Sequence, residues 1–203
     1  MVRKLLGAKV NTCVLTSAIG EAVKVRLDCP YVNEAFSTTT SAQATESFTI
    51  MTFAQGALEC PSGTTIALVQ TMEATIANTN EILWGQGSRF GQQAVPKNRD
   101  YTIRMSIALQ QFADVLQKFY GGATGLVAIP AETATLNLTF DNGLTGTNQR
   151  QIKLAFTGIQ FDEDSMPQDP TALIIEDAIA WARSCTATAI NNTAGNTTTT
   201  YPS

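Results

Sequence analysis

Two segments in the middle of the chain alternate between apolar and polar residues. From Ile66 to Ala77 the even positions are apolar except for Gln70, while the odd positions carry Ala, Val, Thr and Glu. From Asp100 to Leu109 the same alternation returns without interruption. Because successive side chains of a strand point to opposite faces, we predict two β-strands, each with one apolar face and one polar face.

The polar face of the first strand consists mainly of threonine and alanine with a single acid. Thr71, Glu73 and Thr75 lie on it, without the mixture of Lys and Glu that is usual on an exposed sheet. One interpretation is the outer face of a β-sandwich, because Thr is a good strand former. The other interpretation is a face that lines the inside of a larger assembly.

Further strands and one helix are predicted along the rest of the chain. Two short strands fit within Val10–Asp28. Leu109–Tyr120 carries apolar residues at helical spacing and is followed by two glycines, which predicts an amphipathic helix. The turn at Asp141–Gly143 predicts a hairpin, and Gly158 allows a bulge in its second strand.

The chain from Asp162 to Ile190 allows more than one interpretation. The acids at 162, 163, 164 and 169 could indicate calcium or glycosidase chemistry, but the EF-hand spacing is absent, so we favour a solvated acidic loop. Residues 171–178 fit a helix or a strand. The β-branched ending of the segment favours a single last strand at Asp177–Ile190.

Three segments without periodicity are predicted to be loops or arms. Residues 36–46 are rich in Thr, Ser and Ala, and residues 84–98 contain three glycines. The polar tail at 191–203 is expected to be a flexible C-terminal arm. Exposed aromatic residues anchor protein interfaces, so Trp84 and Phe90 are candidates for protein contact, although Trp84 could instead close one end of the core.

The composition excludes several classes of protein. With 203 residues, of which 44% are hydrophobic, the chain can bury a core, and we expect residues 1–190 to form one domain. The net charge of −4 is unlike that of a protein that neutralises phosphates. Because histidine is absent and the four cysteines form no C-x-x-C pair, we predict no catalytic, cofactor or metal site and no enzyme activity.

The N-terminal region is basic but does not resemble a signal peptide. This region contains only two acidic residues, so its basic residues are expected to form a solvated, positively charged end. The basic residues are Arg3, Lys4, Lys9, Lys24 and Arg26. The first ten residues hold no apolar run typical of a signal peptide, and no later segment reaches the ~18 apolar residues of a membrane span. We therefore expect synthesis in the cytoplasm and no membrane insertion.

With its elements in this order, the chain resembles the tail tube protein, or major tail protein, of tailed bacteriophages and archaeal tailed viruses. The resemblance rests on the ALVQTMEATIANTNEI strand, the WGQGSRFG loop, the DYTIRMSIALQ strand leading into FADVLQKFYGG, and the late pair QIKLAFTGIQF and DAIAWARSCTATAIN. It implies a mainly β fold, with two crossed antiparallel sheets that form a β-sandwich or barrel and one flanking α-helix. It also implies hexameric rings, assembled in the host cytoplasm, that stack head to tail into the hollow tail tube of the virion.

The resemblance implies a lumen through which genomic DNA leaves the capsid. A wall that does not hold DNA should be neutral or acidic, which suits a lumen-facing position for Thr71, Glu73 and Thr75. Arg104, on the polar face of the second strand, suits this wall only if Glu73 or another acid neutralises it across the ladder.

The resemblance also implies contacts between subunits and with other tail proteins such as sheath, tape measure, terminator and baseplate. Long loops would hold the next ring, which makes Trp84, Arg89 and Phe90 candidate contact residues. Head-to-tail stacking needs two complementary surfaces, so the acids Asp162, Glu163 and Asp164 are expected to meet the basic N-terminal region between rings.

Three alternatives remain at this point. A tube subunit of a contractile injection or type VI secretion system would share the architecture. A β-sandwich adhesin or fibre subunit would suit the N-x-T sites at Asn137, Asn191 and Asn196. A hydrolase that uses Asp and Glu would require a convergent set of acids, and the sequence identifies none.

Overall fold

The computed structural model describes residues 2–38, 50–60, 65, 68–88, 90–108, 133–165, 175–191 and 199–201. The strands are β1 (Val2–Leu6), β2 (Thr12–Ala18), β3 (Lys24–Asp28), β4 (Asn33–Ser37), β5 (Gly56–Glu59), β6 (Val69–Ala77), β7 (Asn80–Trp84), β8 (Gly91–Pro96), β9 (Asp100–Ala108), β10 (Thr133–Asp141), β11 (Arg150–Ser165), β12 (Ile175–Ala182), β13 (Ser184–Asn191) and β14 (Thr199–Tyr201). Two short 3-10 helices, η1 (Phe53–Gln55) and η2 (Gly146–Asn148), connect them. The helix predicted at 109–120 lies outside the described residues, and no α-helix occurs within them.

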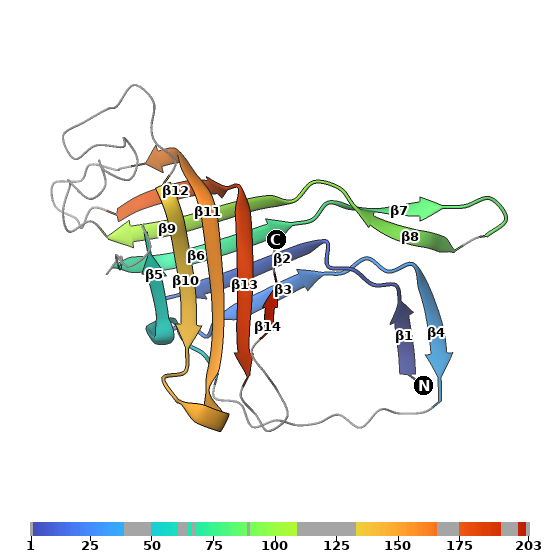
Figure 1. Ribbon diagram of the computed structural model, residues 1–203, viewed down its shortest axis with the longest axis horizontal. Coiled ribbons are helices and arrows are strands. Elements are labelled where there is room, and N and C mark those ends of the chain that lie inside the picture. Colours follow the sequence, from blue (N-terminus) through green and yellow to red (C-terminus); the bar gives the residue numbers. More distant parts are fainter. Residues whose placement is uncertain are drawn as a thin grey trace.

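The protein is mainly β, and its largest unit is one antiparallel sheet of ten strands. The sheet has the order β14-β13-β11-β12-β9-β6-β2-β3, with β10 added to β11 and β5 added to β10. We call β12, β9, β6, β2 and β3 the first half-sheet, and β5, β10, β11, β13 and β14 the second half-sheet. The sequence predicted two crossed sheets; the two halves do cross, as Figure 1 shows, but they belong to one continuous curled sheet.

The 16-residue strand β11 makes the curl possible because it belongs to both halves. It pairs with β13 up to Thr157 and with β10 up to Ile159, and then with β12 from Gln160 onward. Gly158 has φ = 63°, and the buried positions change from Phe156 to Ile159 across it, as predicted. The register with β10 runs unbroken past Gly158, however, and the bulge or irregularity of β11 lies between Phe161 and Glu163. The prediction that Asp162 begins an acidic loop was wrong, because pairing with β12 keeps the backbone extended to Ser165.

The core lies between the two crossing halves. From the first half-sheet it takes Leu15, Met72, Ala74, Tyr101, Ile103, Met105, Ile107, Ala178 and Ala180; from the second it takes Leu58, Leu136, Leu138, Phe140, Leu154, Phe156, Ile159 and Cys185, joined by Cys60. Tyr101 and Phe156 meet edge to face, with ring centroids 6.4 Å apart. One face of every central strand is therefore buried.

The two alternating segments form adjacent strands, as predicted. In β6 Met72 and Ala74 are buried while Thr71 is exposed, and in β9 Ile103 is buried while Arg104 is exposed. The first strand was expected to begin at residue 66, but β6 begins at Val69 and residues 66 and 67 lie outside the described part of the chain.

The predicted last strand at Asp177–Ile190 is in fact two strands, β12 and β13, separated by a bend at Arg183. The backbone N–H of Arg183 donates to the carbonyl oxygen of Thr157, where the chain passes from the first half-sheet to the second. The bend also changes which positions face the core, from Ala178 and Ala180 to Cys185. An unbroken strand would have placed Cys185 on the opposite face.

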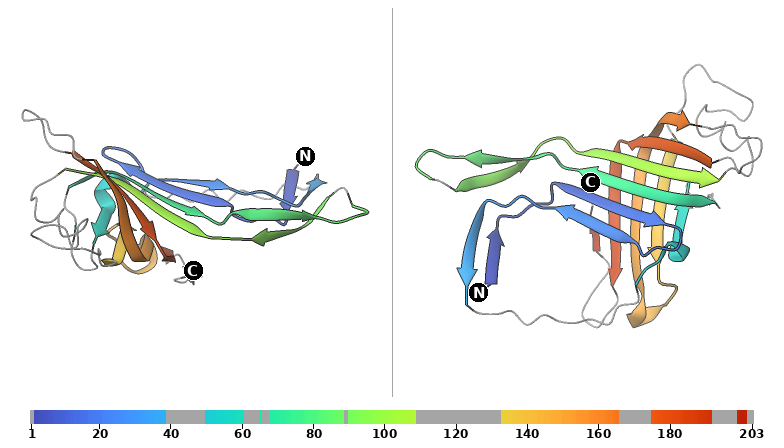
Figure 2. Two further views of the ribbon diagram at one scale, coloured as in Figure 1. Left: turned by 90° about the horizontal axis from the view of Figure 1, so that it is seen from above. Right: turned by 180° about the vertical axis from the view of Figure 1, so that it is seen from behind.

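Two ribbons extend from the same end of the first half-sheet. β1 pairs with β4, and β7 pairs with β8, each as a separate two-stranded sheet. Figures 1 and 2 show the β7–β8 hairpin projecting beyond the ten-stranded sheet along its strands. The predicted loop at 84–98 is therefore largely strand; the predicted loop at 36–46 begins within β4, and its residues 39–46 are not described.

Residues 191–203 were predicted to form a flexible C-terminal arm, of which the structure describes only residues 191 and 199–201. Thr199–Tyr201 forms β14, which pairs with Ala187–Ala189 at the edge of β13. Edge pairing satisfies backbone groups that a free arm would leave to solvent.

The crossing of the halves depends on Phe156, which is fully buried where β11 passes under β9. We expect Phe156→Ala to reduce the free energy of unfolding by about 3–5 kcal/mol, because it leaves a cavity in the core. Phe36→Ala, at a position 59% exposed on β4, should change it by less than about 0.5 kcal/mol. Urea unfolding followed by tryptophan fluorescence measures both, and equal losses would contradict the assigned core.

Candidate functional site

The face of the first half-sheet that points away from the core is mainly polar, although Val14, Ile179 and Trp181 also lie on it, and we call it the polar face. Thr71, Glu73 and Thr75 lie together on it, as predicted for neighbours two apart on one strand. Antiparallel pairing aligns Thr71 with Ser106 of β9 and Thr75 with Thr102. Small hydroxyl side chains therefore form rows across the centre of the polar face.

The charges on the polar face are balanced. In register with the threonine rows lie the basic residues Lys24, Arg26 and Arg104 and the acidic residues Asp28, Glu73, Asp100 and Asp177. The three basic and four acidic residues leave a net charge of only −1, and they lie on β3, β6, β9 and β12.

Arg104 lies directly opposite Glu73 in the β6–β9 ladder. Side chains at directly opposed positions have Cβ atoms roughly 4.5–5.5 Å apart, close enough for opposite charges to offset each other. The two do not form one of the ion pairs found among the described residues, which are Arg3–Glu34, Lys24–Glu21 and Lys97–Glu81. The register thus places the acid named from the sequence opposite Arg104, but no ion pair among the described residues joins the two.

The polar face is hollowed around this pair. A depression of about 520 Å³ is lined by Thr16, Glu73, Arg104, Ser106, Asp177 and Ile179, among others. Sequence analysis found only the β6 and β9 part of this surface. The β12 part, with exposed Asp177 and Trp181 opposite buried Ala178 and Ala180, was signalled by the same alternation.

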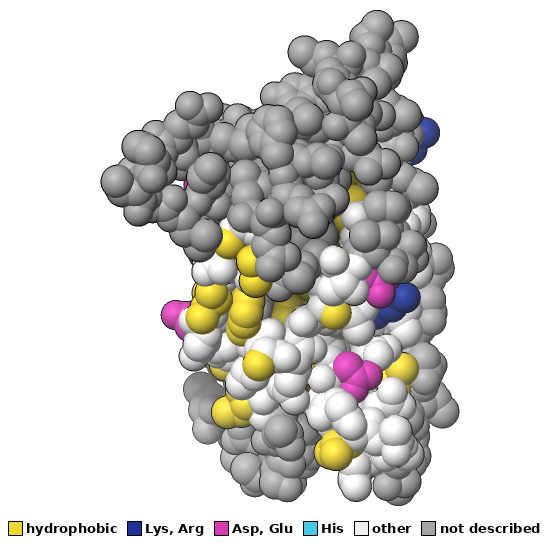
Figure 3. Space-filling view, turned by 90° about the vertical axis from the view of Figure 1, so that its left-hand side faces the viewer, with side chains coloured by type: hydrophobic (Ala, Val, Ile, Leu, Met, Phe, Trp, Pro, Cys, Tyr) yellow, Lys and Arg dark blue, Asp and Glu magenta, His cyan; other side chains and the backbone are white. Residues whose placement is uncertain are grey.

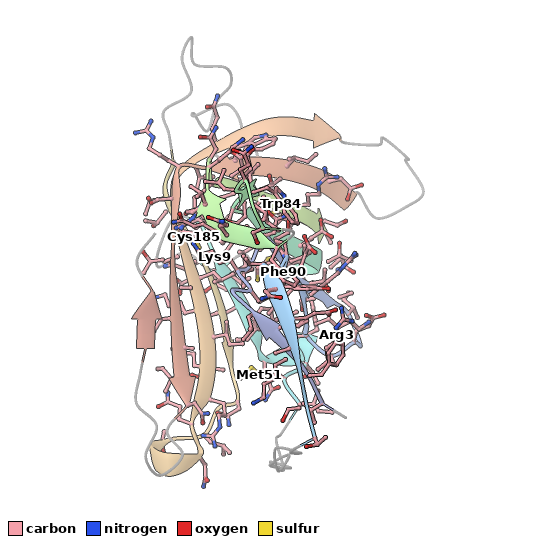
Figure 4. All side chains as sticks on the ribbon, turned by 90° about the vertical axis from the view of Figure 1, so that its right-hand side faces the viewer. Arg3, Lys9, Met51, Trp84, Phe90 and Cys185 are labelled. Carbon is pink, nitrogen blue, oxygen red and sulfur yellow. The ribbon has the colours of Figure 1, made fainter. Side chains whose placement is uncertain are left out.

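The tip of the β7–β8 hairpin presents two aromatic residues to solvent. Trp84 is 67% exposed and Phe90 is 43% exposed, and Figure 4 shows both on the end of the molecule that carries the ribbons. Leu83, beside Trp84, is also exposed. The third predicted contact residue, Arg89, lies outside the described residues.

Side-chain hydrogen bonds fix the base of this hairpin. The amide groups of Asn78 and Asn80 both donate to the carbonyl oxygen of Val10, at 2.9 and 2.8 Å. Lys9 Nζ donates to the carbonyl oxygen of Ala94 in β8, at 2.6 Å. Thr79, between the two asparagines, has φ = 45°, a conformation that costs energy in a β-branched residue. The hairpin therefore leaves the sheet in a fixed direction.

The basic N-terminal residues are largely engaged within the chain. Arg3 pairs with Glu34 and lies over the ring of Tyr31, Lys24 pairs with Glu21, and Lys9 holds β8. Asp162, Glu163 and Asp164, the acids expected to meet this region in a neighbour, lie in β11 where it pairs with β12.

The cysteines offer no reactive centre in the part of the chain that is described. Cys13, Cys29, Cys60 and Cys185 are free thiols. Burial raises the pKa of Cys185 to about 12 and also raises the pKa of Cys13, so both thiols are held in the neutral form. The described residues contain no group of three or more Cys, Asp or Glu side chains arranged to hold a metal ion, and no helix among them could span a membrane.

Comparison with known proteins gives little further information. No family model and no curated protein matches the chain. One solved structure with some similarity is the "Crystal structure of Hcp protein"; the match has 11% sequence identity, covers 73% of this chain and 98% of that chain, and has a TM-score of 0.32. A TM-score this low does not establish a common function.

The thiol of Cys185 should give the stability a distinct pH dependence. The pKa in the fold is raised above the ordinary value of 9.0, so the unfolded thiol ionises first as the pH rises. The free energy of unfolding should therefore fall as the pH increases from about 9 toward 12. Cys185→Ala should show a shallower fall in urea unfolding series, and parallel curves would contradict a buried neutral thiol.

Proposed function

We propose that the protein is a structural subunit that assembles with copies of itself into rings and then into a hollow tube, with the polar face lining the lumen. The observation that carries this proposal is the polar face itself. It combines rows of Thr and Ser with balanced charges on a surface five strands wide. In the proposal, this wall lets viral genomic DNA pass from the capsid to the host.

The composition of the polar face suits a channel for a polyanion. Phosphates are held by clustered Lys and Arg, and each contact adds affinity that slows movement. Here the basic side chains are interspersed with acids, and Glu73 stands opposite the most central cation, Arg104. Thr71 and Thr75 are hydrogen-bonding groups without charge. DNA would meet a hydrated wall to which it does not bind.

Stacking of rings in one direction requires that opposite ends of the subunit fit each other. The aromatic tip of the β7–β8 hairpin lies at one end of the long axis. At the other end, a recess of about 210 Å³ is lined by Phe53, Ala57, Val69 and Phe140, among others. Figure 3 shows hydrophobic side chains gathered on this end. In the proposal, Trp84 of one ring enters this recess in the next ring.

A tube subunit of a contractile injection system would use the same surfaces and differs only in what passes through the lumen. The structure removes one of the N-x-T sites that favoured an adhesin or fibre subunit. Asn137, a predicted N-x-T glycosylation site, is buried in β10 and donates to Glu59 Oε2 at 3.2 Å. A glycan could not be attached to this side chain in the folded protein.

Purified protein at high concentration should form rings or tubes with a central hole in negative-stain electron microscopy. In assembled protein, Thr71→Lys/Thr75→Lys should bind double-stranded DNA in a filter assay that is sensitive to salt, because it adds cations to the lumen wall. The matched control Thr145→Lys/Asn148→Lys adds the same charge near η2, away from the polar face. Compact monomers at all concentrations, or equal DNA binding by both variants, would contradict the proposal.

The hairpin tip gives a separate test of stacking. Trp84→Ala should leave single rings intact and reduce tube length at least about tenfold, since central aromatic anchors typically contribute about 2 kcal/mol or more to an interface. Trp181→Ala, which removes an exposed Trp from the polar face, is the matched control and should leave tube length unchanged. Tube length distributions from micrographs measure both; full-length tubes from Trp84→Ala would exclude the hairpin tip as a stacking contact.

A further inference from the structure

Three basic side chains line a depression near the point where the β7–β8 hairpin leaves the sheet. They are Lys97 and Arg99, from the connection between β8 and β9, and Arg183, from the bend between β12 and β13. The depression has a volume of about 390 Å³, and its lining includes Ser184 of β13 and the core residue Tyr101. No Asp or Glu occurs among its described lining residues. The depression is therefore a cationic site at the end of the core and not on the polar face.

Neighbouring acids offset only part of this positive charge. Glu81 of β7 forms an ion pair with Lys97. Asp100 follows Arg99 in the chain, but the alternation of β9 places its side chain on the polar face. Arg99 takes part in none of the ion pairs between described residues. Cations that line one depression repel one another, so a bound anion would be stabilised there.

The charge of Arg99 also acts on the second half-sheet. Burial raises the pKa of the Cys185 thiol to about 12, the nearby Cys13 thiol adds to this rise, and the positive charge of Arg99 opposes it. Cys185 follows Ser184 in β13. The guanidinium group of Arg99 is thus close enough to the start of β13 for one ligand to contact both sides of the depression.

The donors come from separate segments of the chain, which favours a tetrahedral anion over a planar one. A carboxylate has two oxygens in one plane and is matched by a single guanidinium fork. A phosphate group has oxygens that point in several directions and can accept from Lys97, Arg99 and Arg183 together. Ser184 Oγ lies 2.5 Å from Thr157 Oγ1. When Thr157 is the donor of that bond, the Ser184 hydroxyl can donate to the anion.

Asn78, in the connection between β6 and β7, distinguishes between tetrahedral anions. Its Nδ2 donates to the carbonyl oxygen of Val10, whereas its Oδ1 is buried and receives no hydrogen bond from the described residues. A buried acceptor of this kind needs a donor. At neutral pH inorganic phosphate retains a P–OH group, and sulfate does not. We propose that the depression binds inorganic phosphate, with Lys97, Arg99 and Arg183 on its charged oxygens and Asn78 on its P–OH group.

A phosphate ion in this position would join three connections of the fold. These are the connection from β6 to β7, the connection from β8 to β9, and the bend between β12 and β13. The first two form the base of the hairpin, and the third is where the chain passes between the half-sheets. Because all these residues belong to one chain, the site does not depend on assembly into a tube.

Isothermal titration calorimetry of the full chain with sodium phosphate at pH 7, at an ionic strength held constant with sodium chloride, tests the proposal. We expect saturable binding with a dissociation constant of about 1 mM or below. Sulfate and acetate should each bind about tenfold more weakly, because both lack the P–OH donor. Double-stranded DNA, whose phosphodiesters also lack it, should not displace phosphate.

Two variants remove single donors from the site. Arg99→Gln and Arg183→Gln should each raise the dissociation constant for phosphate about tenfold, because each loses a charge-assisted hydrogen bond. The matched control is Arg26→Gln, at an exposed position of β3 on the polar face, which should bind phosphate like the wild type. Phosphate should also raise the thermal unfolding midpoint of the wild type more than that of either site variant.

Several results would overturn the phosphate site. They are the absence of saturable binding, equal binding of phosphate and sulfate, displacement by DNA, and unchanged binding in both site variants. An equal loss in Arg26→Gln would show a general effect of net charge and would also overturn it. Circular dichroism verifies that each variant is folded. Since these measurements do not involve rings or tubes, the phosphate site and the proposed function can fail separately.

Discussion

The structure depends on the curl of one sheet over its own apolar face. β11 pairs with both halves, and the halves bury Ile103, Phe140 and Phe156 between them. Burial of such side chains is worth roughly 1.5–3 kcal/mol each, so this face decides the fold. Among the described residues, the central strands bury one side in the core and present the polar face on the other. The polar face is thus a direct result of how the core is closed.

The parts of the fold that the sequence predicted are those where burial imposes a pattern. β6 and β9 alternate because one face meets the core, and Gly158 allows the change of buried face in β11 because φ = 63° is easily reached only without a Cβ. The same alternation placed Thr71, Glu73 and Thr75 on a common face. Nothing in one strand could show that Arg104 stands opposite Glu73, since register depends on pairing across the sheet.

The strands and the break that sequence reasoning missed depend on pairing with other strands. The β7–β8 hairpin pairs only with itself, so most of its residues are exposed and its composition is that of a loop. β14 consists of three residues and gains its structure only from the edge of β13. The break at Arg183 follows from the passage between half-sheets, which no property of residues 177–190 reveals. In each case the partner strand, and not the segment, determines the outcome.

The bond from Lys9 to Ala94 links two ribbons that are otherwise separate sheets. Lys9 follows β1, and Ala94 lies in β8, whose partner β7 carries Trp84. A force applied to the N-terminal ribbon would therefore reach the hairpin through this charge-assisted hydrogen bond and through those from Asn78 and Asn80 to Val10. A partner that binds β1 and β4 would therefore also fix the orientation of the β7–β8 hairpin. The two ribbons would then move together relative to the ten-stranded sheet.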